Sequence, residues 1–343
     1  MTQTPTRPTV RRRPTMVDVA RHAGVSLKTV SRVVNDEPVG QELVSRVLAA
    51  IAELGFRRND IARNLRSRQL NATVGLLIEE IANPFYATIA SVAAEIAAAH
   101  GTMLITASSE EDPERERAVL QDFTQRRVDG LLVVPAGLDH SFLRREVELG
   151  MPVVFLDRPP QGLLADAVLL DNRGGSHAGV SALLDEGHRR VGLLLGAPSV
   201  PTIRERLVGA RAALAEAGVE PDESLVRDRL IAPEEAGRAV AALLDLPDPP
   251  TAFFCANNRL TVGALQELHR RGSDAALVGF DDFELAHLMP RPLTVVAYDT
   301  RELARVATER LFQRIAGDDD SPPSTIVLPT SLLRRGLTPP RKP

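Results

Sequence analysis

Apolar positions recur with two different periods along this chain, and the change of period divides it. Near the N-terminus, Val17, Ala20, Val25, Val30 and Val33 recur at the spacing of helices that bury one face. From residue 73 onward, short continuous apolar runs alternate with amphipathic stretches, which is typical of buried parallel strands connected by helices. The pattern therefore predicts a small helical module followed by a larger α/β body.

The first two helices are predicted to flank a tight turn. Gly24 interrupts the apolar pattern and supplies a permissive backbone. Ser26 offers a side-chain oxygen to unpaired amides and is predicted to cap the second helix. A helix, a short turn and a capped helix form a helix-turn-helix, whose second helix enters the major groove of DNA. From the pattern alone, an ordinary helical hairpin with a solvated polar face is the alternative.

The exposed face of the second helix is predicted to contact DNA. Arginine and lysine reach guanine acceptors, hydroxyl groups reach base edges or phosphates, and an exposed leucine can contact a thymine methyl group. The residues expected on this face are Ser26, Leu27, Lys28, Thr29, Ser31 and Arg32.

A third helix is predicted over residues 41–54, and Gly55 would end it. Its apolar face would contain Leu43, Val44, Val47, Leu48, Ile51 and Leu54. Residues 15–57 would then form a three-helix headpiece, preceded by a disordered basic arm at residues 1–14. Residues 58–71 are predicted to form a short arginine-rich helix or linker, too short to be stable alone in water.

The body, residues 73–336, is predicted to form two α/β lobes with doubly wound parallel sheets. Two series of strands are expected, at 74–78, 103–107, 130–134, 153–156 and 168–170, and at 191–195, 252–255, 276–279 and 294–297. Helices are expected at 87–100, 113–126, 174–186, 206–217 and 261–271. Because loops at the carboxyl ends of parallel strands form binding crevices, a ligand cleft is expected between the lobes.

Charge is distributed unevenly along the chain. Residues 1–70 contain 13 Lys and Arg against 6 Asp and Glu, whereas the remainder contains 28 against 39. A basic N-terminal module on an acidic body is consistent with phosphate contacts confined to one end. The one cysteine, Cys255, lies in an apolar run and is predicted to be a buried thiol in a reducing, cytoplasmic environment. No apolar stretch approaches the length needed to span a membrane, and the N-terminus does not resemble a secretory signal.

Catalytic motifs are absent from the sequence. The segment Gly174–Gly179 narrowly misses a nucleophile elbow because Ala178 replaces the second glycine. The seven histidines are scattered and form no metal-binding pattern. We therefore expect no enzyme activity, no cofactor and no metal.

Several motifs resemble those of the lactose-repressor family of bacterial transcription regulators. In the headpiece they are VDVA from Val17, AGVS from Ala23, and TVSRVVN from Thr29 to Asn35. In the body they are NPFY from Asn83, LDR from Leu156, DNRGG from Asp171, GHRRVGLLLG from Gly187, RERLVGARAAL from Arg204, GFDD from Gly279 and PLTVVAYD from Pro292.

The resemblance implies a hinge helix that orders on operator DNA and pairs with its dimer mate in the minor groove. Asn59, Ala62 and Arg66 match hinge positions, Leu65 matches a leucine that wedges between base steps, and Asn35 matches a DNA contact. It also implies a body like that of periplasmic sugar-binding proteins. One lobe would comprise about 73–170 and 299–323, and the other about 171–298 and 324–336, including a final strand from Ile326 to Arg334.

The resemblance further implies a set of effector contacts in the cleft. These are Phe85, Tyr86, Asp157, Arg206, Asn257, Asp281 and Tyr298. Carboxylates, a guanidinium and an amide suit vicinal hydroxyl groups, and an aromatic face suits the C–H side of a sugar ring. The chain departs from the family pattern at Asn258, where Asp is usual, at Tyr298, where Gln is frequent, and at Arg58, where Pro is common.

These observations predict a homodimeric transcription regulator that acts as a repressor. It would bind double-stranded, pseudo-palindromic operator DNA and respond to a small sugar-like effector. The alternative is a solute-binding protein or receptor that uses only the two-lobed body, which the helical N-terminal module disfavours.

Overall fold

The computed structural model describes residues 16–34, 38–54, 72–283, 286, 293–319 and 321–335. The chain divides into two compact units, residues 1–71 and 72–343. Asn35 and the predicted hinge residues Asn59, Ala62, Leu65 and Arg66 lie outside the described residues, so their roles stay predictions.

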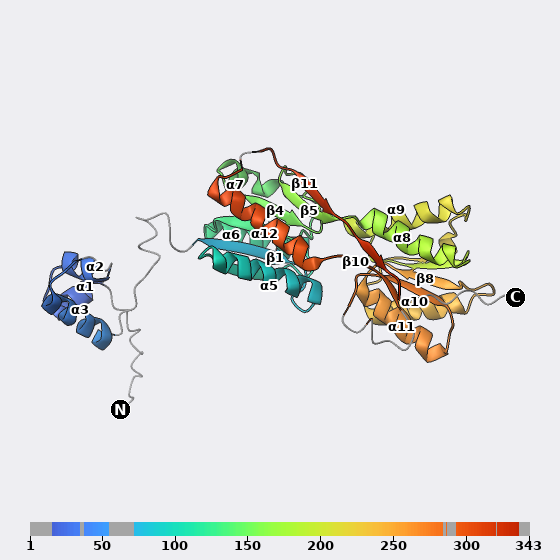
Figure 1. The fold of residues 1–343 in the computed structure, drawn as a ribbon, viewed down its shortest axis with the longest axis horizontal. Helices are drawn as coiled ribbons and strands as arrows, with labels where there is room; N and C mark the ends of the chain where they lie inside the picture. Colours follow the sequence, from blue (N-terminus) through green and yellow to red (C-terminus); the bar gives the residue numbers. More distant parts are fainter. Residues whose placement is uncertain are drawn as a thin grey trace, which may run out of the picture. The chain divides into compact units, whose positions relative to one another are not determined.

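Helices pack around a small apolar core in the N-terminal unit (Figure 1). They are α1 (Met16–Ala23), α2 (Leu27–Val34) and α3 (Gln41–Leu54). Their core contains Val19, Ala20, Ala23, Val30, Val33, Val47 and Ala50. Leu48 was expected on the buried face of α3, but this prediction is wrong, since its side chain is 54% exposed. One helical residue beyond Val47 is a rotation of about 100°, which turns Leu48 away from the core.

The turn between α1 and α2 has the predicted geometry. Gly24 adopts a φ of 61°, the left-handed conformation that favours glycine. The backbone N–H of Thr29 donates to Ser26 Oγ at 3.0 Å, which confirms Ser26 as the cap of α2. Arg46 of α3 also donates through Nη2 to the carbonyl oxygens of Ala23 and Gly24, at 2.7 and 3.1 Å. Hydrogen bonds therefore hold the turn against the third helix.

The first lobe of the body is a parallel sheet with strand order β11-β5-β4-β3-β1-β2. Its strands are β1 (Thr73–Ile78), β2 (Met103–Ser108), β3 (Gly130–Val133), β4 (Val153–Leu156), β5 (Asp166–Leu170) and β11 (Thr325–Leu328). Helices α5 (Pro84–Ala99) and α12 (Thr300–Ala316) pack on one face. Helix α6 (Pro113–Gln125), the 3-10 turn η1 (Ser141–Leu143) and α7 (Arg144–Glu148) follow on the other side.

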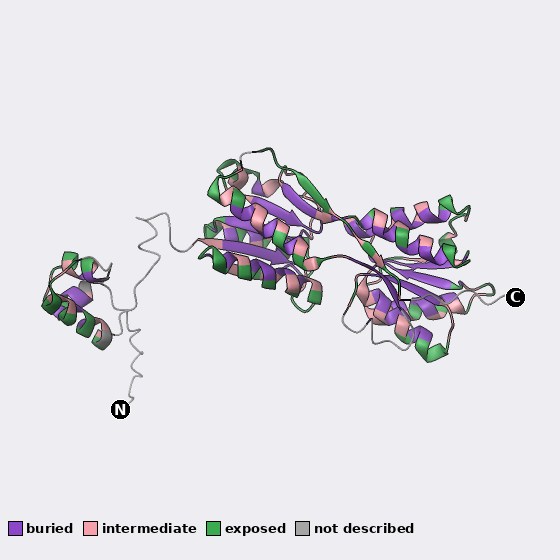
Figure 2. Ribbon diagram, viewed as in Figure 1, coloured by how far each residue is buried: buried purple, intermediate pink, exposed green. Residues whose placement is uncertain are grey.

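The second lobe has strand order β12-β10-β9-β8-β6-β7, and only β12 runs antiparallel to its neighbour among these described strands. Its strands are β6 (Val191–Leu194), β7 (Val226–Arg227), β8 (Ala252–Cys255), β9 (Ala276–Phe280), β10 (Thr294–Ala297) and β12 (Ser331–Leu333), with the 3-10 turn η2 (Glu223–Leu225) before β7. Helices α8 (Asn172–Asp185) and α9 (Pro201–Glu216) cover one face, and α10 (Pro233–Leu244) and α11 (Asn258–Arg271) cover the other. Figure 2 shows the central strands of both sheets buried between these layers.

The chain crosses between the lobes after β5, after β10 and after β11 (Figure 1). A single final strand in the second lobe, from Ile326 to Arg334, was predicted, and this is wrong. Residues 325–328 pair in parallel with β5 of the first lobe, and residues 331–333 pair with β10 of the second. Pro329 separates the two strands, because a residue without an N–H cannot continue the ladder of hydrogen bonds.

The fold also bears on the predictions for the cysteine and for membrane-spanning segments. Cys255 is free and buried in β8, as predicted, and burial raises the pKa of its thiol. Within the part of the chain that the structure describes, no helix has the length and apolar character needed to cross a bilayer.

Candidate functional site

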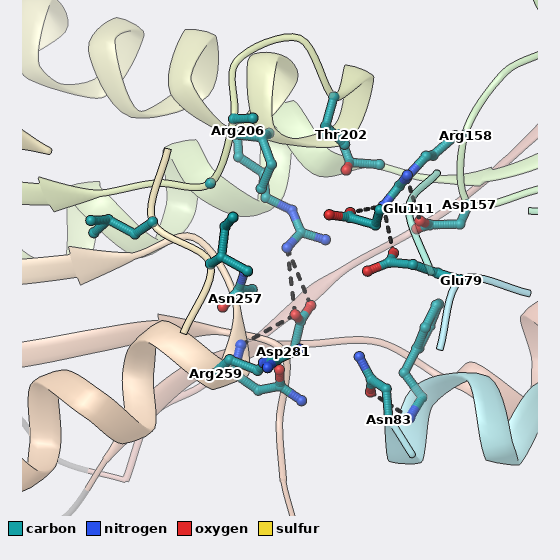
Figure 3. A pocket seen from close by; sticks show the side chains of 18 of the residues that line it. Glu79, Asn83, Glu111, Asp157, Arg158, Thr202, Arg206, Asn257, Arg259 and Asp281 are labelled. Carbon is teal, nitrogen blue, oxygen red and sulfur yellow. Dashed lines mark hydrogen bonds and ion pairs between the residues drawn. The ribbon is translucent and has the colours of Figure 1, made fainter. Parts of the chain in front are cut away.

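A cavity of about 350 Å³ lies between the two lobes of the body, at the carboxyl ends of their strands (Figure 3). Its walls come from segments after β1, β2 and β4 in the first lobe and after β6, β7, β8, β9 and β10 in the second. All the predicted effector contacts line it, namely Phe85, Tyr86, Asp157, Arg206, Asn257, Asp281 and Tyr298. The fold therefore brings together residues that are separated by more than 200 positions in the sequence.

Arg158 organises the wall contributed by the first lobe. Its Nη2 donates to Glu79 Oε2 at 2.6 Å and to Glu111 Oε1 at 3.2 Å, and its Nη1 donates to the carbonyl oxygen of Pro135 at 3.1 Å. Its Nε lies 3.7 Å from Asp157 Oδ2. One buried guanidinium therefore faces three carboxylates.

The carboxyl group of Glu79 is the most perturbed of these acids. It accepts a hydrogen bond from the hydroxyl of Tyr86 as well as from Arg158. Burial raises the pKa of Glu79 to about 7, with Glu111 adding to the rise and Arg158 opposing it. Glu79 can therefore exchange a proton near neutral pH.

Asp157 presents a carboxylate to the cavity. Its side chain accepts no hydrogen bond from the described residues, although the residue is only 6% exposed. Burial raises its pKa, and the charges of Arg158 and Arg206 oppose that rise. A buried acceptor of this kind is stabilised by a donor from a bound molecule, because an unsatisfied buried carboxylate is unfavourable.

Arg206 is the corresponding cation on the wall of the second lobe. Its Nε donates to Asn172 Oδ1 at 2.7 Å, and its Nη1 donates to the carbonyl oxygen of Ala256 at 2.5 Å. The same Nη1 lies 3.4 Å from Asp281 Oδ1, and the guanidinium stacks 3.6 Å from the centroid of the Phe280 ring. Figure 3 shows Arg206 pointing into the cavity toward Asp281.

Asp281 and Asn257 are held by local backbone geometry. Asp157 and Asp281 both follow a strand with a left-handed φ, 64° and 72°, a conformation that aspartate tolerates better than most residues. Tyr298 donates its hydroxyl proton to Asp281 Oδ1 at 2.8 Å. The side-chain oxygen of Asn257 caps α11 by accepting from the N–H of Leu260 at 2.8 Å.

Aromatic rings form the floor of the cavity. Phe85 makes edge contacts with Tyr86 and with Tyr298, at centroid distances of 4.9 and 5.8 Å. Tyr298 lies on the crossing after β10 and packs against the cores of both lobes. The ring is thus placed to respond to a change in lobe closure.

Sequence reasoning missed Glu79, Glu111, Arg158 and Arg259, which also line the cavity. A signal was present for Arg158, because the motif LDR includes it beside Asp157. Arg259 joins the lobes across the cavity, since its Nη1 lies 2.9 Å from Oε2 of Glu80, which follows β1. Adjacent acids in the loop after a strand resemble solvated loop residues, so Glu79 and Glu111 gave no comparable signal.

The predicted DNA contacts described by the structure lie on α2 and at its start. Leu27 is 47% exposed, and Lys28 and Arg32 are exposed. Ser26 and Thr29 are hydrogen-bonded to each other through their hydroxyl groups at 2.8 Å, and Ser31 is half-buried. The exposed side chains suit base contacts, whereas Ser26 acts first as the helix cap.

Comparison with known proteins agrees with both units. Residues 15–59 match the model of bacterial regulatory proteins of the lacI family, and residues 180–338 match that of periplasmic binding protein-like domains. The ribose operon repressor of Haemophilus influenzae is 31% identical over 328 residues, which cover 94% of this chain and 98% of that protein. The repressor PurR of Photobacterium profundum is 32% identical over 309 residues, covering 88% and 92% respectively.

Among solved structures, the lac repressor dimer bound to operator and an anti-inducer superposes with a TM-score of 0.77 at 27% identity. The match covers 96% of this chain and 99% of that chain. Because the relatives are transcriptional repressors, the expectations of a regulator rather than an enzyme and of a headpiece joined to a two-lobed body are confirmed. The chain belongs to the lacI family of bacterial regulatory proteins and is a DNA-binding transcription regulator.

Proposed function

We propose that this regulator is a homodimeric repressor whose affinity for a pseudo-palindromic operator changes when a small sugar-like molecule occupies the cavity between its lobes. The observation that carries the proposal is the cavity itself. It combines the buried carboxylate of Asp157 with the half-buried carboxyl groups of Glu79 and Asp281, two buried guanidinium groups and aromatic side chains in one site. Such a set of groups suits a molecule with several hydroxyl groups and an apolar ring face.

The size of the cavity supports a small effector. A volume of about 350 Å³ corresponds to roughly a dozen water molecules at about 30 Å³ each. This space suits a single sugar ring better than a longer oligosaccharide. D-ribose is a reasonable first probe because the relative from Haemophilus influenzae is named for a ribose operon.

The DNA-binding side of the proposal rests on the headpiece. The exposed Lys28 and Arg32 on α2 can reach base edges in the major groove, and residues 1–70 carry an excess of basic side chains. The related lac repressor was solved as a dimer on its operator, and a two-fold pair of headpieces matches a pseudo-palindrome. Such a regulator would act in the cytoplasm, on the chromosome.

The crossings between the lobes provide a route from ligand to lobe closure. Arg206 is hydrogen-bonded to Asn172, whose Nδ2 donates to the carbonyl oxygen of Leu170 at 3.2 Å, at the end of β5. Tyr298 lies on a second crossing and is hydrogen-bonded to Asp281. A ligand that rearranges Arg206 or Asp281 therefore acts directly on two of the crossings between the lobes, those after β5 and after β10. A change in closure would then alter the order of residues 58–71 and so the affinity for DNA.

The chain contains a built-in reporter for testing this proposal. It has two tyrosines and no tryptophan, and both Tyr86 and Tyr298 line the cavity. Tyrosine emission therefore reports on this site without labels and without interference from the headpiece. Sugars that change the emission in a saturable manner would be tested for their effect on operator binding.

The operator itself would come from selection of random duplex DNA by the full-length protein. We expect one palindromic consensus, bound far more tightly than scrambled DNA, and a change of affinity on addition of a sugar that alters tyrosine emission. Purely salt-dependent binding without a consensus would contradict the regulator as proposed and favour a solute-binding role for the body.

A further inference from the structure

We propose that Glu79 and Glu111 make the cavity selective for uncharged, hydroxyl-bearing ligands, because they occupy the Arg158 guanidinium that would otherwise bind a phosphate or carboxylate. The inference rests on the proposed function only in taking the cavity as the ligand site. It adds the charge class of the ligand and two residues that determine it.

The terminal nitrogens of Arg158 are already engaged. Its Nη2 is shared by Glu79 and Glu111, at 2.6 and 3.2 Å, and its Nη1 donates to the carbonyl oxygen of Pro135. Its Nε makes no hydrogen bond to the described residues, but this nitrogen is buried and lies 3.7 Å from the carboxylate of Asp157. A phosphate group that approached this guanidinium would therefore meet carboxylates on each open side.

Two nitrogens of the second buried guanidinium, Nε and Nη1 of Arg206, are also engaged, and Nη1 is paired with an acid. Arg206 donates to Asn172 and to the carbonyl oxygen of Ala256 and is paired with Asp281. Arg259, at the rim, is paired with Glu80 across the cleft. Among the lining residues that the structure describes, Arg229 remains as an exposed cation, outside these buried networks.

More carboxyl groups surround Arg158 than are needed to balance its single positive charge. Asp157 alone would balance its charge, and Glu79 and Glu111 add two further carboxyl groups to the same wall. The crowding is reflected in the pKa of Glu79, which burial and Glu111 raise to about 7. A wall of this composition accepts hydrogen bonds from hydroxyl groups and repels negative charge.

The test uses the full-length protein, tyrosine emission and inorganic phosphate as the anionic probe, at an ionic strength held constant with sodium chloride. D-ribose and D-ribose 5-phosphate serve as a matched neutral and anionic pair. The variants are Glu111→Ala and the double variant Glu79→Gln with Glu111→Ala. Glu205→Ala is the control, because it removes an exposed acid that is paired with Arg173 at 2.9 Å and does not line the cavity. Both tyrosines belong to the body and line the cavity, so their emission is used to monitor this site.

We expect no saturable change of tyrosine emission with phosphate in the wild type or in the control. In the double variant we expect a saturable change, with an apparent dissociation constant for phosphate at least tenfold below the lower limit that the wild-type titration sets. Glu111 is half-exposed, so Glu111→Ala should fold and show a weaker gain even if circular dichroism shows the double variant to be unfolded. A saturable response of the wild type to phosphate or D-ribose 5-phosphate, or silence of both variants, would overturn the inference. If D-ribose changes the tyrosine emission of none of these proteins, the result would count against the sugar effector. The phosphate titrations would still decide the role of Glu79 and Glu111.

Discussion

The proton on Glu79 provides a test of the cavity that requires no knowledge of the effector. Glu79 is faced by Tyr86 from α5, by Asp157 and Arg158 after β4, and by Glu111 after β2. Its pKa rises from an ordinary value of 4.5 to about 7 in the folded protein, chiefly because the carboxyl group is buried. The folded state therefore holds this proton more tightly than the unfolded chain does.

The sign and size of the effect follow from linkage. A carboxyl group whose pKa is raised on folding contributes stability that is fully present below pH 4.5 and is lost as the pH rises through about 7. A shift of this size corresponds to at most about 3–4 kcal/mol, since one pKa unit is about 1.4 kcal/mol. Glu79 shares Arg158 with Glu111, so the measured change should be smaller than this upper limit.

The assay is urea unfolding of the full chain at several pH values from 5 to 8, followed by tyrosine emission. Both tyrosines belong to the body, so the separate headpiece does not contribute to the signal. The free energy of unfolding should fall over this range by about 1–3 kcal/mol more in the wild type than in Glu79→Gln, which cannot titrate at this position. All other groups are common to both proteins, so their contributions cancel in the comparison. Parallel pH profiles for the two proteins would refute the assignment of a raised pKa to Glu79.

Four further predictions follow from the two units. Arg32→Ala should weaken operator binding by about 1–3 kcal/mol and reduce discrimination against scrambled DNA in anisotropy titrations, and an unchanged ratio would exclude a base contact. Leu65→Ala should reduce DNA bending together with affinity, so an unaltered bend in gel mobility assays would count against the proposed wedge. Arg206→Ala should abolish the ligand response while operator binding persists, and should lower the free energy of unfolding by about 1–3 kcal/mol because buried acceptors lose their donor. Glu80→Arg and Arg259→Glu should each alter effector affinity by up to about fivefold, because the ion pair that they break is partly exposed. The double variant with both substitutions exchanges the two charges and should restore the affinity. Failure to restore it would show that this ion pair does not couple the lobes.

The sequence predicted the elements best where one periodicity runs without interruption. The third helix was expected at 41–54 and is α3, since its apolar spacing begins after Gly40 and ends at Gly55. Gly24 and Ser26 were also sufficient to place the turn, because each has a backbone role that few other residues can fill. Local chemistry therefore determines most of the headpiece.

The composition of the cavity could be predicted only in part. Motifs identified Asp157, Arg206 and Asp281, whereas Glu79 and Glu111 acquire their role only when the fold brings them to Arg158, 79 and 47 positions away in sequence. The division of the last strand depends on partners that the local pattern does not reveal, because residues 325–328 pair with β5 and residues 331–333 pair with β10, both distant in the sequence. Long-range pairing and shared charges are the information that the local sequence lacks.

The coupling between cavity and DNA is tested most directly by measuring it in both directions. With the selected operator and a sugar found through tyrosine emission, operator affinity would be measured with and without the sugar, and sugar affinity with and without the operator. Because the two binding equilibria are linked, we expect the same factor in both directions and a loss of that factor in Arg206→Ala. An operator affinity that is identical with the cavity empty and saturated would show that the cavity does not control DNA binding.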